Sequence, residues 1–174
     1  MKDIIKPIAV LAGICLAVTA LLAYINMITS PIIARAEEEA AAQARSEVLS
    51  EADGFEKLSV DLPEGVTEAY KASNGSGYVF MLSTKGYGGE IVLSCGIRSD
   101  GTIEKTETLI HSETSGIGSK VVDNESPYRK QYEGKTADDL DSVDAVTGAT
   151  ISSKAYKKAI AAAFEAYDSV KEAK

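Results

Sequence analysis

The chain begins with a long apolar stretch. From Pro7 to Ala34 it has no charged residue, and Ile8–Ile28 is almost wholly apolar. That length matches the ~20 residues that a helix needs to cross a bilayer. A buried core helix would normally show a polar face, and this stretch shows little of one. The pattern predicts a single transmembrane helix within residues 1–30.

Two other kinds of N-terminal segment share part of this pattern. A cleaved signal peptide has an apolar region of roughly 7–15 residues, which is shorter than this one, although Ala34-Arg35-Ala36 resembles a cleavage site. A lipoprotein signal is disfavoured because Ile14, before Cys15, is too bulky for a usual lipid-attachment box. Lys2 and Lys6 precede the apolar run and favour a cytoplasmic N-terminus, with the remainder outside the cell membrane.

Residues 31–58 are predicted to form a stalk after the chain leaves the membrane at Ser30-Pro31. Glu37–Glu51 is rich in alanine, acidic at its start and carries Arg45 further on, which suits a helix and its dipole. A docking helix for a partner protein would have the same composition. The stretch offers few apolar positions to bury, which favours a solvated stalk.

The sequence pattern of residues 59–174 is typical of a folded domain. Over Val66–Ile110, short apolar runs alternate with turn residues, and Asn74-Gly75 and Asp100-Gly101 are typical hairpin turns. About four antiparallel strands are expected here. Ser115–Lys120 is expected to be a glycine-rich loop that enters a short helix, and Asn124–Asp141 to be irregular.

The C-terminal segment Ser152–Val170 has the apolar period of a helix that would pack on the sheet. Strands followed by a helix imply an α+β fold class. The expected architecture is a transmembrane helix and a stalk helix, then an antiparallel sheet closed by the C-terminal helix.

Charge and cysteine content exclude several classes of function. The formal net charge is −8 and no basic stripe is present, which argues against nucleic acid as a partner. The cysteines are Cys15, inside the apolar run, and Cys95, and the chain has a single histidine. A zinc site or an iron–sulfur cluster held by this chain alone is therefore not expected.

The segment with the most chemical information is Asp144–Lys154, at the start of the C-terminal helix. It places four hydroxyl side chains around Gly148. A helix N-terminus presents free N–H groups and a partial positive charge, and so favours a phosphate. From the residues alone, a simple helix cap is the favoured explanation of the hydroxyls. Two weaker segments, Gly86–Ile91 and His111–Lys120, are rich in glycine and could be ordinary turns.

Together these segments resemble the FMN-binding domain in the G subunit of the Rnf ion-translocating electron-transport complex. The related C subunit of the sodium-pumping NADH:quinone oxidoreductase is similar but longer. The family's attachment pattern, Asp-x-x-Ser/Thr-Gly-Ala-Thr, is complete at Asp144–Thr150. Its His-x-Glu-Thr-x-Gly-x-Gly and Gly-Tyr-x-Gly stretches match His111–Gly118 and Gly86–Gly89, with Ser115 where the family commonly has proline.

The resemblance implies that FMN is joined to Thr150 through a phosphoester, made from FAD by a separate flavin transferase that recognises a sequence including Asp144. The cofactor-binding residues that it implies are Thr150, Thr147, Gly148, Ala149, Ser152, Asp144, His111, Glu113, Thr114, Gly116, Gly118, Gly86, Tyr87 and Gly89. Lys120 is a further candidate near the ring or phosphate. No residue of the chain is expected to be catalytic in its own right, because the flavin carries the redox chemistry.

The implied function is electron relay between ferredoxin and NAD in a complex that transports Na⁺ or H⁺, with other membrane subunits as partners. Two alternatives stay open on the residues alone. One is a membrane-anchored binding or assembly protein without flavin, whose hydroxyls only cap a helix. The other is a stand-alone extracytoplasmic flavin reductase.

Overall fold

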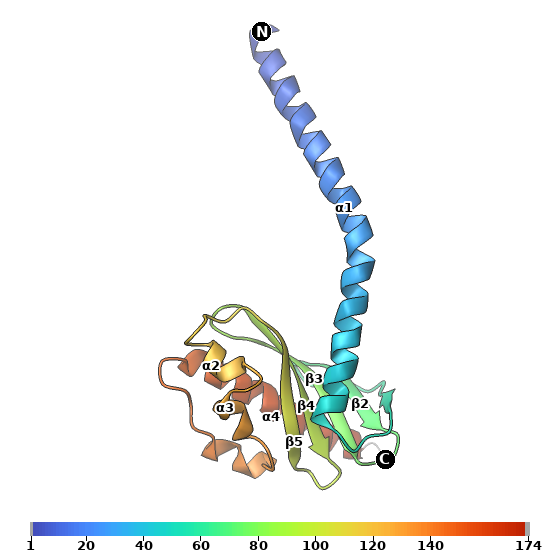
Figure 1. The fold of residues 1–174 in the computed structure, drawn as a ribbon, viewed down its shortest axis with the longest axis vertical. Helices are drawn as coiled ribbons and strands as arrows, with labels where there is room; N and C mark the ends of the chain where they lie inside the picture. The colour runs from blue at the N-terminus through green and yellow to red at the C-terminus, as the bar shows by residue number, and fades with distance from the viewer. Residues whose placement is uncertain (1, 173–174) are drawn as a thin grey trace. The chain divides into compact units, whose positions relative to one another are not determined.

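The computed structural model describes the backbone of residues 2–172 and the side chains of residues 6–171. The chain divides into two units, residues 1–40 and 41–174, and each is described by itself. Helix α1, Lys2–Val48, supplies the first unit and extends into the second (Figure 1). Pro31 lies inside this helix, so the predicted helix and stalk are one continuous element at the level of the backbone.

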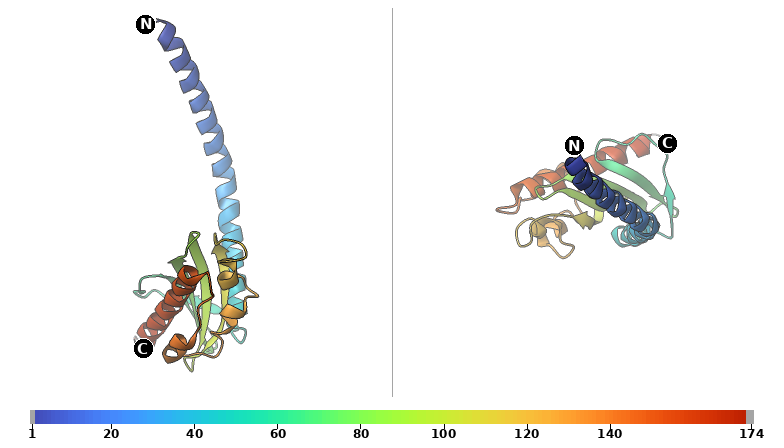
Figure 2. Two further views of the ribbon diagram at one scale, coloured as in Figure 1. Left: turned by 90° about the vertical axis from the view of Figure 1, so that its left-hand side faces the viewer. Right: turned by 90° about the horizontal axis from the view of Figure 1, so that it is seen from above.

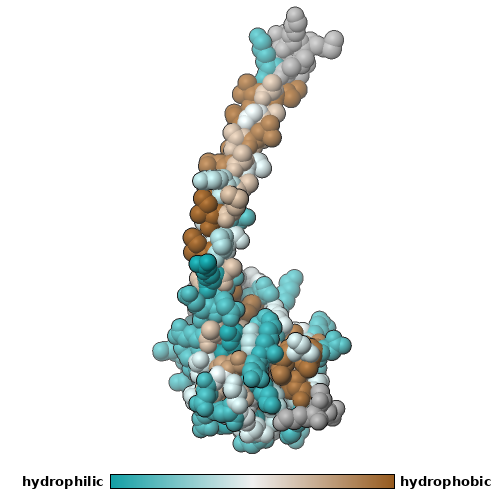
Figure 3. All heavy atoms as spheres, turned by 90° about the vertical axis from the view of Figure 1, so that its right-hand side faces the viewer, coloured by the Kyte–Doolittle hydropathy of each residue, from teal (hydrophilic) through white to brown (hydrophobic). Residues whose placement is uncertain are grey.

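The apolar part of α1 is exposed along its whole length. Leu11, Leu16 and Met27 are typical, with 64–71% of their surface accessible, and Figure 3 shows brown apolar side chains along this segment. Among the described residues, α1 is the one helix that is long and apolar enough to cross a membrane. A helix that is apolar on all sides is stable only where something other than water covers it.

The second unit is built on a five-stranded antiparallel sheet with the strands in chain order (Figures 1 and 2). The strands are β1 Phe55–Lys57, β2 Val66–Ala72, β3 Gly77–Lys85, β4 Glu90–Arg98 and β5 Ile103–His111. The α+β class and the four strands from β2 to β5 are confirmed. The short strand β1, which pairs with the end of β2, was not predicted.

The two predicted hairpin turns are also confirmed. Gly75 and Gly101 have φ of +76° and +89°, a conformation that glycine adopts without steric cost. The remaining elements are α2 Ser119–Val122, α3 Pro127–Lys130, the 3₁₀ helix η1 Ala137–Ser142, and α4 Thr150–Glu172. Helix α4 contains the predicted Ser152–Val170.

The larger core lies between α4 and one face of the sheet. Phe80, Leu93, Tyr156, Ile160 and Phe164 are among its members. The segment Asn124–Asp141, expected to be irregular, contains α3 and most of η1 and contributes Tyr128 and Tyr132 to this core. The prediction failed because polar residues surround these tyrosines in the sequence, so no apolar pattern indicated that the tyrosines would be buried.

The other face of the sheet carries a smaller core that includes the end of α1. Val48 and Leu49 are 0% and 1% exposed and pack with Tyr70 and Met81. Gly96 of β4 makes room for them, because a Cβ there would lie 2.6 Å from the carbonyl carbon of Val48. The expectation of a fully solvated stalk is therefore wrong for residues 41–49, and the helix ends at Val48 rather than Glu51.

Candidate functional site

A tight turn leads into α4 and fixes the direction of the segment with the hydroxyl side chains. The N–H of Ala149 donates to the carbonyl oxygen of Val146 at 3.0 Å. Gly148 sits in the turn with φ of +84°, which any other residue would adopt only with strain. Thr150 follows as the first residue of α4, and its side chain is exposed.

The four hydroxyl side chains of this segment divide into two buried and two exposed ones. Ser152 and Ser153 are 1% and 2% exposed. The Ser152 hydroxyl donates to Oε2 of Glu113 at 2.7 Å, and the Ser153 hydroxyl accepts from the N–H of Val146 at 3.1 Å. Thr147 and Thr150 are exposed. The two serines therefore hold the turn in place, and the two threonines are available to a ligand.

A buried tyrosine, Tyr128, forms a hydrogen bond with the first turn of α4. The hydroxyl of Tyr128 donates to the carbonyl oxygen of Ser153 at 2.9 Å and lies 2.8 Å from the hydroxyl of Tyr132. Burial raises the pKa of Tyr128. It therefore keeps its proton and stays a hydrogen-bond donor.

A hollow of about 450 Å³ opens beside Thr150. Its walls come from the start of α4, the loop after β5 and the β3–β4 hairpin. They consist of Tyr87, Glu113, Thr114, Ile117, Gly118, Gly148, Ala149, Thr150, Ile151 and Ser152. The volume lies within the ~300–1,000 Å³ that is usual for small-molecule sites.

Exposed apolar side chains gather around this hollow. Among the described side chains of residues 41–171, the exposed large apolar ones are Val60, Tyr87, Ile110, Ile117 and Ile151. Three of them, Tyr87, Ile117 and Ile151, line the hollow. Apolar surface left in water at a concave site marks a place that a ligand or a partner covers.

Comparison with known proteins agrees with these observations. Residues 86–165, which span all the walls of the hollow, match the family described as the FMN-binding domain, and residues 1–48 match the RnfG N-terminal region. The chain is 31% identical to the G subunit of the proton-translocating ferredoxin:NAD⁺ oxidoreductase complex of Clostridium ljungdahlii, over 83% of this chain and 81% of that protein. The chain belongs to the RnfG family.

Two further relatives cover most of both chains. The G subunit of the Na⁺-translocating ferredoxin:NAD⁺ oxidoreductase complex of Acetobacterium woodii is 28% identical, over 86% of this chain and 84% of that protein. The G subunit of the ion-translocating oxidoreductase complex of Methanosarcina acetivorans is 32% identical, over 94% of each. As an RnfG family member, the chain is a subunit of an ion-translocating oxidoreductase with an FMN-binding domain.

Most of the residues that the Rnf resemblance suggested line the hollow. Those that do are Tyr87, Glu113, Thr114, Gly118, Gly148, Ala149, Thr150 and Ser152. Gly86 lies behind the wall, where a Cβ would be 3.1 Å from Cδ of Glu113. Thr147 and Gly116 are exposed near the walls and do not line the hollow. Ile117 and Ile151 line it and were missed, because a single isoleucine in a polar stretch carries no signal of its own.

His111 lies at the end of β5 and does not line the hollow. Its Nδ1 accepts a hydrogen bond from the N–H of Glu113 at 3.4 Å, and its Nε2 lies 3.7 Å from Oδ1 of Asp123. The structure therefore gives His111 a contact with the loop that carries Glu113, rather than a place on the wall.

Asp144 and Lys120 line a separate hollow of about 680 Å³ beside α3. Its other walls include Tyr128, Gln131 and Val146. The backbone N–H of Asp144 donates to Oε1 of Gln131 at 3.2 Å, and the Asp144 side chain is exposed. The first and last residues of the attachment pattern thus border different hollows.

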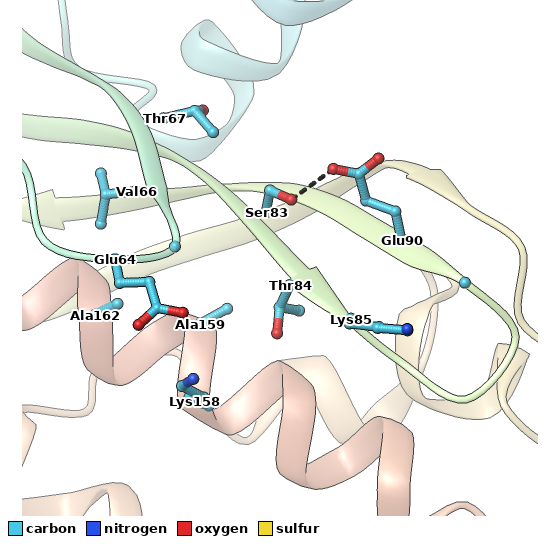
Figure 4. Close-up of a pocket in the computed structure, with 12 residues that line it drawn as sticks. Glu64, Val66, Thr67, Ser83, Thr84, Lys85, Glu90, Lys158, Ala159 and Ala162 are labelled. Carbon is cyan, nitrogen blue, oxygen red and sulfur yellow. Dashed lines mark hydrogen bonds between the residues drawn. The ribbon is translucent and has the colours of Figure 1, made fainter.

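A third hollow, of about 650 Å³, lies between α4 and the ends of β2 and β3 (Figure 4). Glu64 and Lys158 line it, and the Ser83 hydroxyl donates to Oε1 of Glu90 at 2.6 Å. Gly89 is the one residue of the predicted set on its walls.

Proposed function

We propose that this chain carries FMN, joined through a phosphoester to the hydroxyl of Thr150, and relays electrons within an Rnf-type complex. The observation that supports this most strongly is the place of Thr150. It is exposed, it begins α4, and it lies on the wall of a hollow with apolar sides. Its side chain forms no hydrogen bond with another described residue, so no structural role competes for the hydroxyl.

The residues of the hollow fit this cofactor in two ways. The N–H groups of the first turn of α4 have no partner within the helix and carry its partial positive charge, which suits a phosphate. The apolar side chains of Tyr87, Ile117 and Ile151 suit a flat aromatic ring system. Bound FMN would supply the redox chemistry, and the protein would supply its position and electrostatic surroundings.

Attachment requires a group transfer to Thr150. In the reaction we propose, the Thr150 oxygen bonds to the flavin-side phosphorus of FAD, the bond between that phosphorus and the bridging oxygen breaks, and AMP leaves with the bridging oxygen. The threonine proton is released overall, and no electrons are exchanged. A separate flavin transferase would catalyse the step. The exposed Asp144 side chain is available for it to recognise.

The relatives' names suggest the wider role. Two of them belong to complexes that transfer electrons between ferredoxin and NAD⁺. One of these complexes is named for proton transport and the other for Na⁺ transport. We therefore expect the coupling ion for this chain to be one of these two. The partners would be the other membrane subunits of such a complex.

We further propose that α1 crosses the cell membrane once and that residues 59–174 lie outside the cytoplasm. Lys6, at the start of the apolar run, is followed by no other charged side chain until Arg35. Positive charge at the N-terminal end favours a cytoplasmic N-terminus. A tethered and covalently bound flavin would not diffuse away from the membrane.

Replacement of the attachment residue tests the proposal. Full-length chain should be co-expressed with a flavin transferase, as wild type, Thr150→Ala and Thr84→Ala. Thr84 is a matched control, because it offers a hydroxyl on the wall of the hollow in Figure 4. Flavin fluorescence in a denaturing gel should persist in wild type and Thr84→Ala and vanish in Thr150→Ala. Fluorescence that persists in Thr150→Ala would refute attachment at this residue.

A further inference from the structure

Glu113 is a buried carboxylate at the candidate site, and three separate segments of the chain meet at it. The residue is 8% exposed and lies two residues after the end of β5. Oε2 accepts from the Ser152 hydroxyl at 2.7 Å, and Oε1 accepts from the backbone N–H of Gly88 at 3.0 Å. One side chain thus links the β3–β4 hairpin, the loop after β5 and the first turn of α4.

Three glycines of the two weaker sequence segments lie against this residue. A Cβ on Gly118 would lie 2.9 Å from Cβ of Glu113, and one on Gly86 would lie 3.1 Å from its Cδ. A Cβ on Gly88 would lie 2.9 Å from Cα of Glu113. Side chains at these positions would push the loops away from Glu113, so the glycines let the loops reach it.

Among the described side chains, no cationic group lies within 4 Å of this carboxylate. None of the ion pairs formed by the described side chains involves Glu113. Its charge is stabilised by the hydroxyl of Ser152 and the amide of Gly88, both neutral donors.

We propose that Glu113 is a positioning residue: it fixes the hairpin and the start of α4 against each other, and its charge makes the flavin in the hollow harder to reduce. The second half rests on the proposed function, because it needs a flavin at this site. The first half concerns the chain by itself. A buried negative charge opposes the addition of electrons nearby, and it acts strongly because little water screens it.

Three substitutions separate the two halves. Glu113→Gln keeps the shape, because the amide oxygen accepts from Gly88 and the amide nitrogen donates to the Ser152 hydroxyl, which can also accept. It removes only the charge. Glu113→Ala removes both hydrogen bonds. Ser152→Ala removes one of them and leaves the charge.

The positioning role is tested on the full-length chain without flavin. Tyr87-Gly88 is the only Tyr-Gly pair in the sequence, so ¹³C′-tyrosine with ¹⁵N-glycine labelling selects the Gly88 amide. Loss of its hydrogen bond in Glu113→Ala should speed hydrogen exchange by about tenfold or more, whereas Glu113→Gln should stay near wild type. Exchange that is unchanged in Glu113→Ala, or as fast in Glu113→Gln, would overturn the role. If Glu113→Ala does not fold, slow exchange in Glu113→Gln still supports the proposal and fast exchange overturns it.

The electrostatic role is tested on flavin-loaded protein by measuring the midpoint potential. Glu113→Gln should move it to a more positive value. Glu90→Gln removes the same charge from an exposed position on the β3–β4 hairpin and should leave it unchanged. A Glu113→Gln potential that is unchanged or more negative would contradict the proposal, as would an equal positive shift in Ser152→Ala.

The two proposals can fail separately. If the wild-type chain acquires no flavin after co-expression with the transferase, both the proposed function and the electrostatic role of Glu113 are refuted. The Gly88 exchange measurement still decides whether Glu113 positions the loops.

Discussion

Two hollows of the sheet domain touch the same β3–β4 hairpin, and they differ in chemistry more than in size. The larger one, of about 650 Å³, is lined by mixed charges and hydroxyls such as Glu64, Lys158 and Ser83. The smaller one, of about 450 Å³, has apolar walls, one buried acid and the Thr150 hydroxyl. Only the smaller one combines exposed apolar side chains with the start of a long helix. Volume alone would have selected the hollow of about 680 Å³ beside α3 and not the one that Thr150 lines.

The largest expected contrast between the hollows is in stability. Gly118→Ala should lower the free energy of unfolding by about 2–3 kcal/mol, because the new Cβ collides with the held Glu113 side chain. Gly65→Ala, at the other hollow, meets no atom closer than 3.4 Å and should cost about 1 kcal/mol through its φ of +93°. Denaturant unfolding of the flavin-free chain measures both.

A double-mutant cycle tests the cause of the Gly118→Ala effect. If the clash with the Glu113 side chain is the cause, Gly118→Ala should cost much less in a Glu113→Gly background, which removes both Cβ and the carboxylate, since contacting residues are not additive. An equal cost in both backgrounds would show that some other contact is responsible.

A smaller contrast is expected in flavin loading. Ile117→Asp places a charge on the apolar wall, where the proposed ring would have to desolvate it, and should reduce covalent flavin content by about tenfold. Thr84→Asp adds the same charge to the hollow in Figure 4 and should leave loading near wild type. Flavin absorbance per chain, after limited co-expression with the transferase, gives the ratio. Similar losses in both variants would mean that the two hollows are not distinct.

The smallest effect is expected at a contact that lines neither hollow. A hydrogen bond from Nζ of Lys157 at 2.9 Å, with the attraction of its charge, lowers the pKa of Asp141. The pKa is lower in the folded state, so the contribution to stability is present above the unfolded pKa and is lost as pH falls through the folded one. Lys157→Ala should return the Asp141 pKa towards its ordinary value in an NMR titration. Flavin content should not change.

What the sequence could predict was mostly local. The turns at Gly75 and Gly101, the long period of α4 and the apolar run of α1 depend on neighbouring residues, and all three were found. Thr150 was selected by family resemblance, since the residues alone allowed a helix cap. The structure adds that the side chains of Ser152 and Ser153 are buried, whereas those of Thr147 and Thr150 are exposed.

What was missed depends on contacts between distant segments. Val48 is buried because Gly96, far along the chain, leaves space for it. Tyr128 and Tyr132 looked like parts of a polar loop, yet they support the start of α4. Ile117 and Ile151 become meaningful only when the fold brings them to the same hollow.

The central claim is that flavin is joined to Thr150, and peptide mapping tests it most directly. Trypsin should release residues 136–154 as one peptide, which contains Thr150 together with Thr136, Ser142, Thr147, Ser152 and Ser153. After co-expression with a flavin transferase, fragmentation of this peptide should show the mass of FMN less one water on Thr150. An unmodified peptide, or an adduct on any of the other hydroxyls, would contradict the account.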